Sequence, residues 1–381
     1  IFMEVKTAKG ITKLGTGIGS SQMMEEETNI DPSRNRIPTT SDLTIWATDL
    51  GFDALGVADI DLSEQKKPVI DWLRAGFSGE MSYMKRNLKK RLHPELLITG
   101  TCRVICVRKN YLNENANPKK ILEQNKKAYI AQYALGRDYH KLMRKSLGQL
   151  ASRINSATGF GHYRAFVDSA PVLEKPLAQK AGLGWIGKNS LVLNEEAGSW
   201  FFLGEIYTNI PFEPSAEKPN SECGKCQACI NVCPTDAIVE PGKIDARKCI
   251  SYLTIEHKGR IDEQLRSKMG NRIFGCDDCQ IFCPWNRDAQ TTRDERFAPR
   301  HGLDNSDLVE LFNLSQEEFE KLTLGSPIRR IRFDQWQRNI AIALGNSTPS
   351  EHSIKALKDA LGNVSDLVDE HIRWAIKKLS R

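Results

Sequence analysis

The sequence has no long hydrophobic run. It contains 381 residues, of which 40% are hydrophobic, but no apolar stretch approaches the roughly 18 residues that a membrane-spanning helix needs. We therefore expect a protein that does not enter a membrane. The first 40 residues also lack the apolar segment and small-residue cleavage site of an export signal. They are rich in Gly, Ser, Thr and Glu, and we predict that residues 1–40 form a disordered extension.

The chain also lacks the scattered cysteines of a disulfide-rich secreted protein. Eight of its 10 cysteines lie between residues 223 and 283, at spacings typical of metal ligands, which indicates a reducing, cytoplasmic location. The other two, Cys102 and Cys106, lie in the apolar run CRVICV, which predicts a buried strand. Four residues apart on a strand, they would be separated by roughly 13 Å. That distance excludes a disulfide between them, and we expect two core thiols.

Acidic residues are scarce between residues 85 and 153. This segment contains 17 Lys plus Arg and 4 Asp plus Glu, a formal charge of +13, whereas the whole chain carries only +6. The rest of the chain is therefore acidic on balance. Such a charged run is either an ordinary solvated face or a polyanion-binding surface, with nucleic acid as the leading candidate partner.

Beyond the extension, the pattern of segments predicts an α+β protein in three parts. Residues 41–212 alternate between helix-like and strand-like segments, which predicts an α/β domain. A polar linker with three prolines at 211–222 leads into a ferredoxin-like module at 213–295, and helical apolar spacing predicts a helical-repeat-like domain at 296–381. Within the first domain we predict a helix and short strand over 41–60, helices at 120–135 and 139–155, and strands at RVICV, RAFVD, SLVLN and WFFLGEIYTNI.

The clustered cysteines follow two related patterns, C-x2-C-x2-C-x3-C-P from 223 and C-x2-C-x3-C-P from 276. A structural zinc site takes four ligands in two pairs, whereas these endings match the bacterial ferredoxin run, in which the fourth cysteine binds the other cluster. The 26 residues between Cys249 and Cys276 replace the usual two, so we expect an insertion beside the second cluster. The pattern predicts one 4Fe-4S cluster held by Cys223, Cys226, Cys229 and Cys283, and a second held by Cys233, Cys249, Cys276 and Cys279.

A glycine-rich loop, AGLGWIGKN at 181–189, nearly satisfies two nucleotide-binding patterns. It follows a predicted helix and leads into a predicted strand, which is the wrong context for a dinucleotide fingerprint, and Asn189 stands where a phosphate loop needs Ser or Thr. We expect the glycines to permit a close backbone approach instead. Upstream, Asp168 ends a predicted strand and is either a turn former or a catalytic residue. Asp138 is expected to be a cap or a binding contact.

Seven long motifs occur in order along the chain: GEMSYM, ALGRDYHKL, VDSAPVLEKPLAQKAGLGWIGKNSLVLN, CGKCQACINVCPTDAI, RKCISYLTIE, GNRIFGCDDCQIFCPWN and IRRIRFDQWQRNIAIALGN. Together they resemble the epoxyqueuosine reductase family, and the resemblance covers about residues 41–381. It implies an enzyme that reduces epoxyqueuosine to queuosine at the wobble position of a tRNA anticodon loop, the last step of queuosine synthesis. Electrons from an external low-potential donor would pass through two 4Fe-4S clusters to cobalamin. The resemblance also suggests a monomer.

The resemblance further implies a set of site residues. Asp168 corresponds to the proton donor, and burial under the corrin would raise its pKa. Ala131 stands where some relatives carry cysteine, so this chain has no sulfur there, and no motif marks a histidine such as His140 as a cobalt ligand. The implied cofactor contacts are Arg91, Ala131, Asp168, Val192, Leu203, Ser251, Asp277 and Asp278.

The RNA partner implied by the resemblance gives the basic residues a possible role. Phosphate contacts from Lys and Arg position RNA without reading its sequence. Trp336 is expected to pack in a helical core, whereas its basic neighbours are expected to contact the RNA backbone. These neighbours are Arg329, Arg330, Arg332 and Arg338.

Two alternatives stay open on the residues alone. A reductive dehalogenase-like corrinoid protein would share the pairing of a cobalamin domain with two clusters, but the basic segment and the lack of a twin-arginine signal argue against it. A ferredoxin-type electron carrier would not need about 170 residues before its clusters or a helical domain after them.

Overall fold

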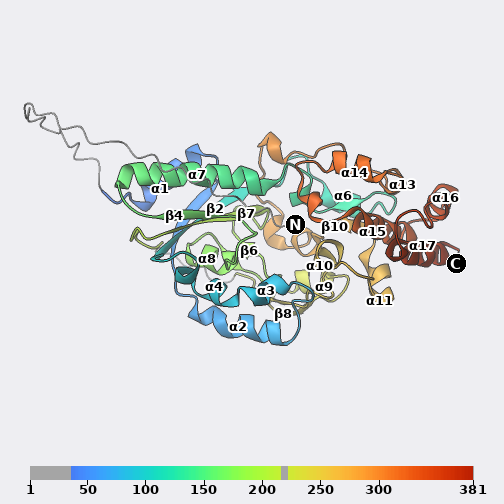
Figure 1. Cartoon of the computed structure of the whole chain (residues 1–381), viewed down its shortest axis with the longest axis horizontal. Helices are drawn as coiled ribbons and strands as arrows, with labels where there is room; N and C mark the ends of the chain where they lie inside the picture. The colour runs from blue at the N-terminus through green and yellow to red at the C-terminus, as the bar shows by residue number, and fades with distance from the viewer. Residues whose placement is uncertain (1–35, 216–221, 381) are drawn as a thin grey trace, which may run out of the picture.

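The computed structural model describes residues 36–215 and 222–380, a mixed helix and sheet fold. The expected extension at 1–40 and linker at 211–222 lie in large part outside these residues. A sheet with its covering helices forms one end of the molecule, and the C-terminal helices form the other (Figure 1). In the part of the chain that is described, no helix combines the length and apolar character needed to cross a membrane.

The main sheet has four strands in the order β1-β2-β7-β4. Every pairing within it is antiparallel, so the α/β part of the prediction, which implies parallel strands, is wrong and the domain is of the α+β kind. Three of the four strands predicted from apolar runs are confirmed here, whereas in SLVLN only Val192–Leu193 is a strand, in a separate hairpin. The strands are β1 (Ala54–Asp59), β2 (Arg103–Asn110), β4 (Tyr163–Phe166) and β7 (Phe201–Thr208), with the hairpin of β5 (Trp185–Ile186) and β6 (Val192–Leu193).

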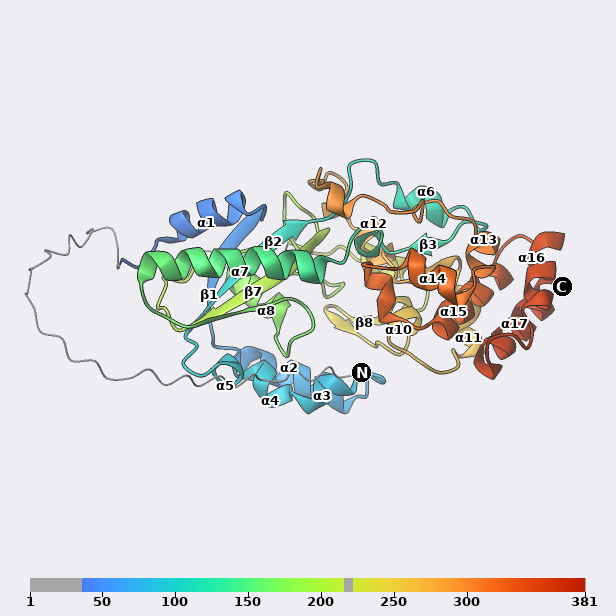
Figure 2. The ribbon, with the colours of Figure 1, turned by 45° about the horizontal axis from the view of Figure 1, so that its top comes forward.

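Helices cover both faces of this sheet, as Figures 1 and 2 show. Because alternate residues of a strand face opposite sides, Ile105 and Val107 pack with one core, while Val104 and Cys106 pack with the other. Helices α1 (Thr40–Asp49) and α7 (Tyr139–Thr158) cover the first face. On the other side lie α8 (Glu174–Lys180) and the run of α2 (Ser63–Arg74), α3 (Ser82–Arg86), α4 (Leu88–Leu92) and α5 (Pro94–Leu97). The expected helix at 139–155, and the helix and strand at 41–60, are confirmed.

The helix predicted at 120–135 is wrong. The segment contains only α6 (Pro118–Leu122), the short strand β3 (Tyr129–Ile130) and the 3-10 turn η1 (Gln132–Ala134). The amide of Asn271 donates to the carbonyls of Ile121, Gln124 and Lys127 at 2.8, 3.2 and 3.0 Å, which a continuous helix would use internally. Strand β3 then pairs in parallel with β10 (Arg272–Phe274). Tertiary pairing therefore overrides the local helical pattern.

The cysteine-rich segment consists of short elements around two cysteine groups. The insertion between Cys249 and Cys276 folds as α10 (Ile250–Ile255), α11 (Glu263–Arg266), the turn η2 (Ser267–Met269) and β10. The remaining elements are α9 (Ala228–Val232), β8 (Ile238–Glu240), β9 (Lys243–Ile244), α12 (Asp278–Ile281), η3 (Pro284–Asn286) and η4 (Glu295–Phe297).

The predicted C-terminal helices are confirmed, and α15 (Phe333–Gly345) lies at their centre. Trp336 is fully buried, so its expected core packing is confirmed. Around α15 lie α13 (Leu308–Phe312), α14 (Gln316–Leu322), the turn η5 (Pro327–Arg330), α16 (Glu351–Asp359) and α17 (Asp366–Leu379).

Arg338 joins this helical part to the insertion, and its expected contact with RNA is wrong. The side chain is fully buried, and its guanidinium donates to the carbonyls of Leu253, His257 and Gly259 at 2.8–2.9 Å. The adjacent Asn339 donates to two further carbonyls near the two ends of the insertion, those of Thr254 in α10 and Ile273 in β10. The charge of Arg338 therefore holds protein backbone and is not available to a phosphate.

Candidate active site and cluster-binding region

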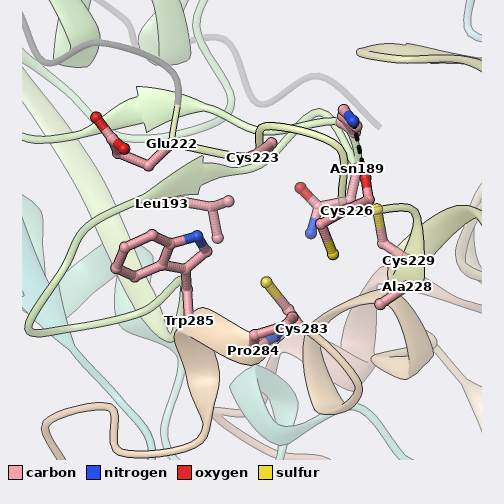
Figure 3. Close-up of a pocket in the computed structure, with 11 residues that line it drawn as sticks. Asn189, Leu193, Glu222, Cys223, Cys226, Ala228, Cys229, Cys283, Pro284 and Trp285 are labelled. Carbon is pink, nitrogen blue, oxygen red and sulfur yellow. Dashed lines mark hydrogen bonds between the residues drawn. The ribbon is translucent and has the colours of Figure 1, made fainter.

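Four of the predicted ligand cysteines meet around one cavity of about 230 Å³. Cys223, Cys226 and Cys229 lie on the loop and first turn leading into α9, and Cys283 approaches from the turn before η3 (Figure 3). These are the four residues that the ferredoxin spacing assigns to the first cluster, although Cys283 is distant in the chain. Burial raises the pKa values of the Cys229 and Cys283 thiols, and backbone N–H groups that face the two sulfur atoms oppose this rise without cancelling it. Such contacts favour bound thiolates.

The other four cysteines form a second group, deeper in the protein. Burial raises the pKa values of the Cys249 and Cys279 thiols. The charge of Cys249 raises that of Cys279 further, and the charge of Cys233 adds to the rise of both. The backbone N–H of Ala237 donates to the Cys233 sulfur at 3.3 Å. The backbone N–H groups of residues 251 and 252 face the Cys249 sulfur. Cys276 is the remaining member, and its thiol donates to Asp278 at 2.9 Å.

The number and grouping of the thiols match two clusters. Within residues 36–215 and 222–380, no three His, Cys, Asp or Glu side chains converge on the position of one metal ion, whereas four cysteines line one cavity of about 230 Å³. A 4Fe-4S cluster takes four cysteine ligands, and eight thiols in two groups of four supply two such sets.

The glycine-rich loop connects the sheet domain to this region. Lys188 donates through Nζ to the carbonyls of Gly224 and Cys226 at 2.7 and 2.8 Å, and the amide of Asn189 donates to the carbonyl of Cys279 at 3.2 Å. At Gly184, where φ is +153°, a Cβ would lie 2.1 Å from the carbonyl oxygen of Leu193. The close approach expected from the glycines is thus to protein backbone, and the loop binds both cysteine groups instead of a nucleotide.

Asp168 lies on the loop after β4 in a strained backbone conformation with φ +52°. One carboxylate oxygen accepts hydrogen bonds from the Tyr139 hydroxyl at 3.1 Å and from the ring of His140 at 2.9 Å. The opposite ring nitrogen of His140 bonds to Asp138 at 2.7 Å, and Asp138 caps α7. The side chains of Asp138, His140 and Asp168 therefore form a continuous chain that ends at an exposed carboxylate.

Electrostatics in this chain place the shared proton on His140. Burial lowers the pKa of His140, but hydrogen bonds and charges from Asp138 and Asp168 outweigh burial and raise it to about 9. Partial burial raises the pKa of Asp168, but His140 and Tyr139 outweigh it, so the net pKa is lowered. The side chain is 57% exposed and faces His140, so the increase in pKa expected from burial under a corrin stays a prediction.

Asp168 opens into a second cavity, of about 160 Å³. Two residues predicted as cofactor contacts, Val192 and Leu203, line it together with Asp168, and so does Lys175 on α8. Burial lowers the pKa of Lys175, and the charges of Glu174, Cys279, Asp168 and Cys249 oppose this effect without cancelling it. The remaining lining residues are Tyr139, Glu174, Leu191, Ser199, Phe201 and Phe202.

The other predicted cofactor contacts lie outside the set that lines this cavity. Arg91 is buried and donates to the carbonyls of Ala170 and Val172, thereby fixing the loop that follows Asp168. Ala131 is fully buried next to β10, and Ser251 follows Cys249. Asp277 accepts from Tyr129 and from the backbone of Gln132, both at 2.8 Å, and Asp278 pairs with Arg272. Their contact with a corrin stays a prediction.

Sequence reasoning missed several residues of this site. Tyr139 and His140 follow the capping Asp138 in GRDYHK. Their position at the start of a predicted helix was the signal available in the sequence. Glu174 and Lys175 are the first residues of α8. Acidic residues are common in the first turn of a helix, where they interact favourably with the helix dipole, so Glu174 gave no sign of a function. Antiparallel pairing of β4 with β7, which brings these segments together, leaves no short motif in the sequence.

The basic segment 85–153 does not form one surface. Its exposed cations are spread over α7 on one face of the sheet, α3 and α4 on the other face, and α6 near the C-terminal helices (Figures 1 and 2), while Arg91 and Arg108 are buried. Closer to the site, Arg330 on η5 pairs with Glu256 at 2.9 Å and lowers the pKa of Asp168. Burial raises the pKa of Tyr83 on α3 to about 12, and the charges of Glu256 and Asp168 add to this rise, whereas that of Arg330 opposes it. Tyr83 and Arg330 are therefore both close enough to Asp168 for the charges to interact.

Together, a matched 4Fe-4S double cluster binding domain over residues 222–286 and an adjacent acid-bearing cavity define an iron–sulfur oxidoreductase. Epoxyqueuosine reductase from Pseudomonas aeruginosa is 51% identical over 333 residues, covering 87% of this chain and 92% of that protein. The Escherichia coli K12 enzyme is 53% identical over 331 residues, 87% of each chain. The chain belongs to the epoxyqueuosine reductase family. A model described as epoxyqueuosine reductase QueG, DUF1730 also matches residues 91–169.

Solved structures support the same assignment. A crystal structure of epoxyqueuosine reductase with an epoxyqueuosine-modified tRNA-Tyr stem loop has a TM-score of 0.81 and 27% identity, covering 90% of each chain. A Bacillus subtilis epoxyqueuosine reductase structure, described as having its catalytic aspartate loop swung out of the active site, has the same TM-score and identity, covering 89% and 90%.

Proposed function

We propose that this chain reduces epoxyqueuosine to queuosine at the wobble position of tRNA anticodon loops, the final step of queuosine synthesis. One observation carries the proposal: the loop at 181–189, which bonds to both cysteine groups through Lys188 and Asn189, leads directly into Leu191 and Val192, and these two residues line the cavity that also holds Asp168. A reactant in this cavity would therefore be near both an electron source and a proton donor. The family membership and the stem-loop complex of a relative support the choice of substrate.

The reaction sets a clear requirement. Removing an epoxide oxygen as water converts two C–O bonds into a C=C bond and consumes two electrons and two protons. We assign electron transfer to two 4Fe-4S clusters, held by Cys223, Cys226, Cys229 and Cys283, and by Cys233, Cys249, Cys276 and Cys279. Since each cluster is fully ligated by thiolates, both act as carriers of electrons from an external low-potential donor.

The lining of the cavity suits contact with part of a cobalamin on chemical grounds. The wall of Leu191, Val192, Phe201 and Leu203 is apolar, but the volume of about 160 Å³ is below the roughly 300–1,000 Å³ of an enclosing ligand pocket, so these residues would contact only part of the group. Bound cobalamin would supply single-electron chemistry at carbon that side chains lack. We propose as its contacts Arg91, Ala131, Asp168, Val192, Leu203, Ser251, Asp277 and Asp278.

Asp168 and His140 divide the proton transfer between them. His140 holds a proton at neutral pH because two carboxylates stabilise the imidazolium. Asp168, at the exposed end of the chain, receives that proton and delivers it to the departing oxygen. A substrate and cofactor covering Asp168 would exclude water and favour the neutral carboxyl. Tyr139 keeps the carboxylate oriented through its hydroxyl.

We propose that the tRNA anticodon loop approaches Asp168 from the side of Tyr83 and Arg330, whose charges interact with that of Asp168. Arg329, Arg330 and Arg332 are exposed on and next to η5, and Lys85 and Arg86 are exposed on α3. Exposed cations of this kind suit phosphate contacts, and the ring of Tyr83 would offer a surface on which a splayed base stacks.

The proposed organisation keeps the predicted boundaries. Residues 41–212 form the cobalamin-binding catalytic domain, 213–295 the two-cluster module and 296–381 the helical domain, after an extension at 1–40. Contacts by Arg338 and the pairing of β3 with β10 tie these parts together. We further propose a cytoplasmic monomer.

Anaerobic turnover of an epoxyqueuosine-bearing anticodon stem loop tests the function. We expect conversion by the wild-type protein with both clusters and cobalamin, and none without cobalamin. Asp168→Asn should retain the corrin absorbance and lose about 10²-fold or more in rate, whereas Asp304→Asn, an exposed acid elsewhere, should react normally. Absence of queuosine with fully loaded wild-type protein would refute the proposed function.

A further inference from the structure

Behind Asp168 lies a buried acid that neither the fold nor the site described so far explains. Glu205 is a central residue of β7, opposite Cys106 on β2 and Phe166 on β4. Its side chain is 0% exposed, and neither carboxyl oxygen has a hydrogen-bond partner within the described residues. An unpaired, ionised carboxylate in such a place is too costly, so the group stays protonated.

Glu174 connects this acid to the active-site cavity. It lines the cavity together with Asp168, and its carboxylate accepts the backbone N–H of Asp168 at 2.6 Å. Its carboxyl also lies close enough to Glu205 to raise the pKa of that residue further. Two carboxyl groups from α8 and β7 therefore face each other directly behind the proposed proton donor.

We propose that Glu174 and Glu205 form a carboxyl pair that stores the second proton of the reaction and releases it through Glu174 into the cavity that holds Asp168. This inference rests on the proposed function, because only removal of the epoxide oxygen as water requires two protons. His140 with Asp168 supplies one, which leaves the other unassigned. On release, an O–H bond of the pair breaks, an O–H bond to the departing oxygen forms, and the pair keeps one negative charge until solvent reprotonates it.

The surroundings keep Glu205 protonated at rest and let Glu174 exchange its proton near neutral pH. Burial and the charge of Asp168 raise the pKa of Glu174 to about 7, and burial with the charge of Glu174 raises the pKa of Glu205 well above its usual value. Lys175 and His140 oppose these effects on Glu174 without cancelling them. The ionisable groups facing the pair are Cys106 on β2, Tyr207 on β7, Asp168 after β4, Tyr139 and His140 on α7, Lys175 on α8 and Arg91 on α4.

Isosteric variants separate proton storage from a structural role. Glu205→Gln keeps the shape and removes the transferable proton, and because the native group is neutral, thermal stability should be unchanged or higher. In single turnovers of the stem loop with pre-reduced protein, we expect less than about two-fold loss near pH 6 and about 10²-fold loss near pH 8.5, where solvent protons are scarce. Glu174→Gln should show the same pH profile. Glu195→Gln, an exposed acid on the loop after β6, should match the wild type.

A second measurement needs no turnover. Infrared difference spectra, wild type minus variant, recorded in H2O and D2O at about pH 7 should show the carbonyl band of one buried protonated carboxyl for Glu205→Gln and no such band for Glu195→Gln. If the difference spectrum for Glu205→Gln lacks this band, or if both Gln variants keep the wild-type pH profile, the proposal is overturned. If the wild type fails to convert the stem loop, the proposed function fails instead, and the infrared result still decides the protonation of the pair.

Discussion

The hydrogen-bonded chain from Asp138 to Asp168 makes a quantitative prediction about His140. The rise in its pKa from 6.5 to about 9 corresponds to about 3 kcal/mol of preference for the imidazolium. Two carboxylates share this effect, at 2.7 and 2.9 Å. Replacing Asp168 by Asn should therefore lower the pKa of His140 by about one unit, while Asp138 retains the remainder.

The assay is an NMR titration of the histidine ring in the wild type, Asp168→Asn and Asp138→Asn. Because the folded-state pKa is raised, the stabilisation is fully present below about pH 6.5 and is lost as the pH rises through about 9. The cost of Asp168→Asn to the free energy of unfolding should therefore be largest near pH 6 and disappear near pH 10. A His140 pKa that stays at about 9 in Asp168→Asn would refute the reasoning, since Asp138 alone would then hold the charge.

Three further predictions concern other parts of the chain. Cys283→Ala should lower the iron content from about eight to about four per chain by metal analysis, whereas Cys106→Ala, a buried thiol outside both groups, should keep about eight. Trp336→Ala should lower the free energy of unfolding by about 3–5 kcal/mol in a denaturant titration, because the ring is fully buried among the C-terminal helices. Arg330→Ala should weaken stem-loop binding and reduce the slope of log affinity against log salt by about 0.7; an unchanged slope would show that Arg330 serves only Glu256.

The sequence predicted best what depends on local spacing. The ferredoxin pattern predicts that Cys283 groups with Cys223, Cys226 and Cys229. The structure agrees, since the same four residues line one cavity. The long helix α7 and the strand β7 follow from apolar periodicity. Cluster binding fixes the spacing of ligand residues, and core packing fixes the spacing of hydrophobic residues. Both spacings can be seen directly in the sequence.

What the sequence could not predict depends on contacts between distant segments. The helix expected at 120–135 is replaced because Asn271 and β10 bind the carbonyls and edge of that segment. Arg338 was assigned to RNA because its burial against residues 253–259 has no local signature. The pKa of Asp168 is likewise set by His140, 28 positions earlier.

The parallel pairing of β3 with β10 has a consequence for dissecting this protein. One strand precedes α7 in the chain and the other lies between two cluster ligands, so a cut between residues 212 and 213 separates hydrogen-bonded neighbours. A cut between residues 295 and 296 likewise separates Arg338 from the carbonyls that it binds. The three parts are consequently interdependent, and loading of the clusters with iron should also change the stability of the C-terminal helices. Transplanting the redox module into another scaffold would require carrying along the segment around Tyr129, as well as Arg338 with its helix.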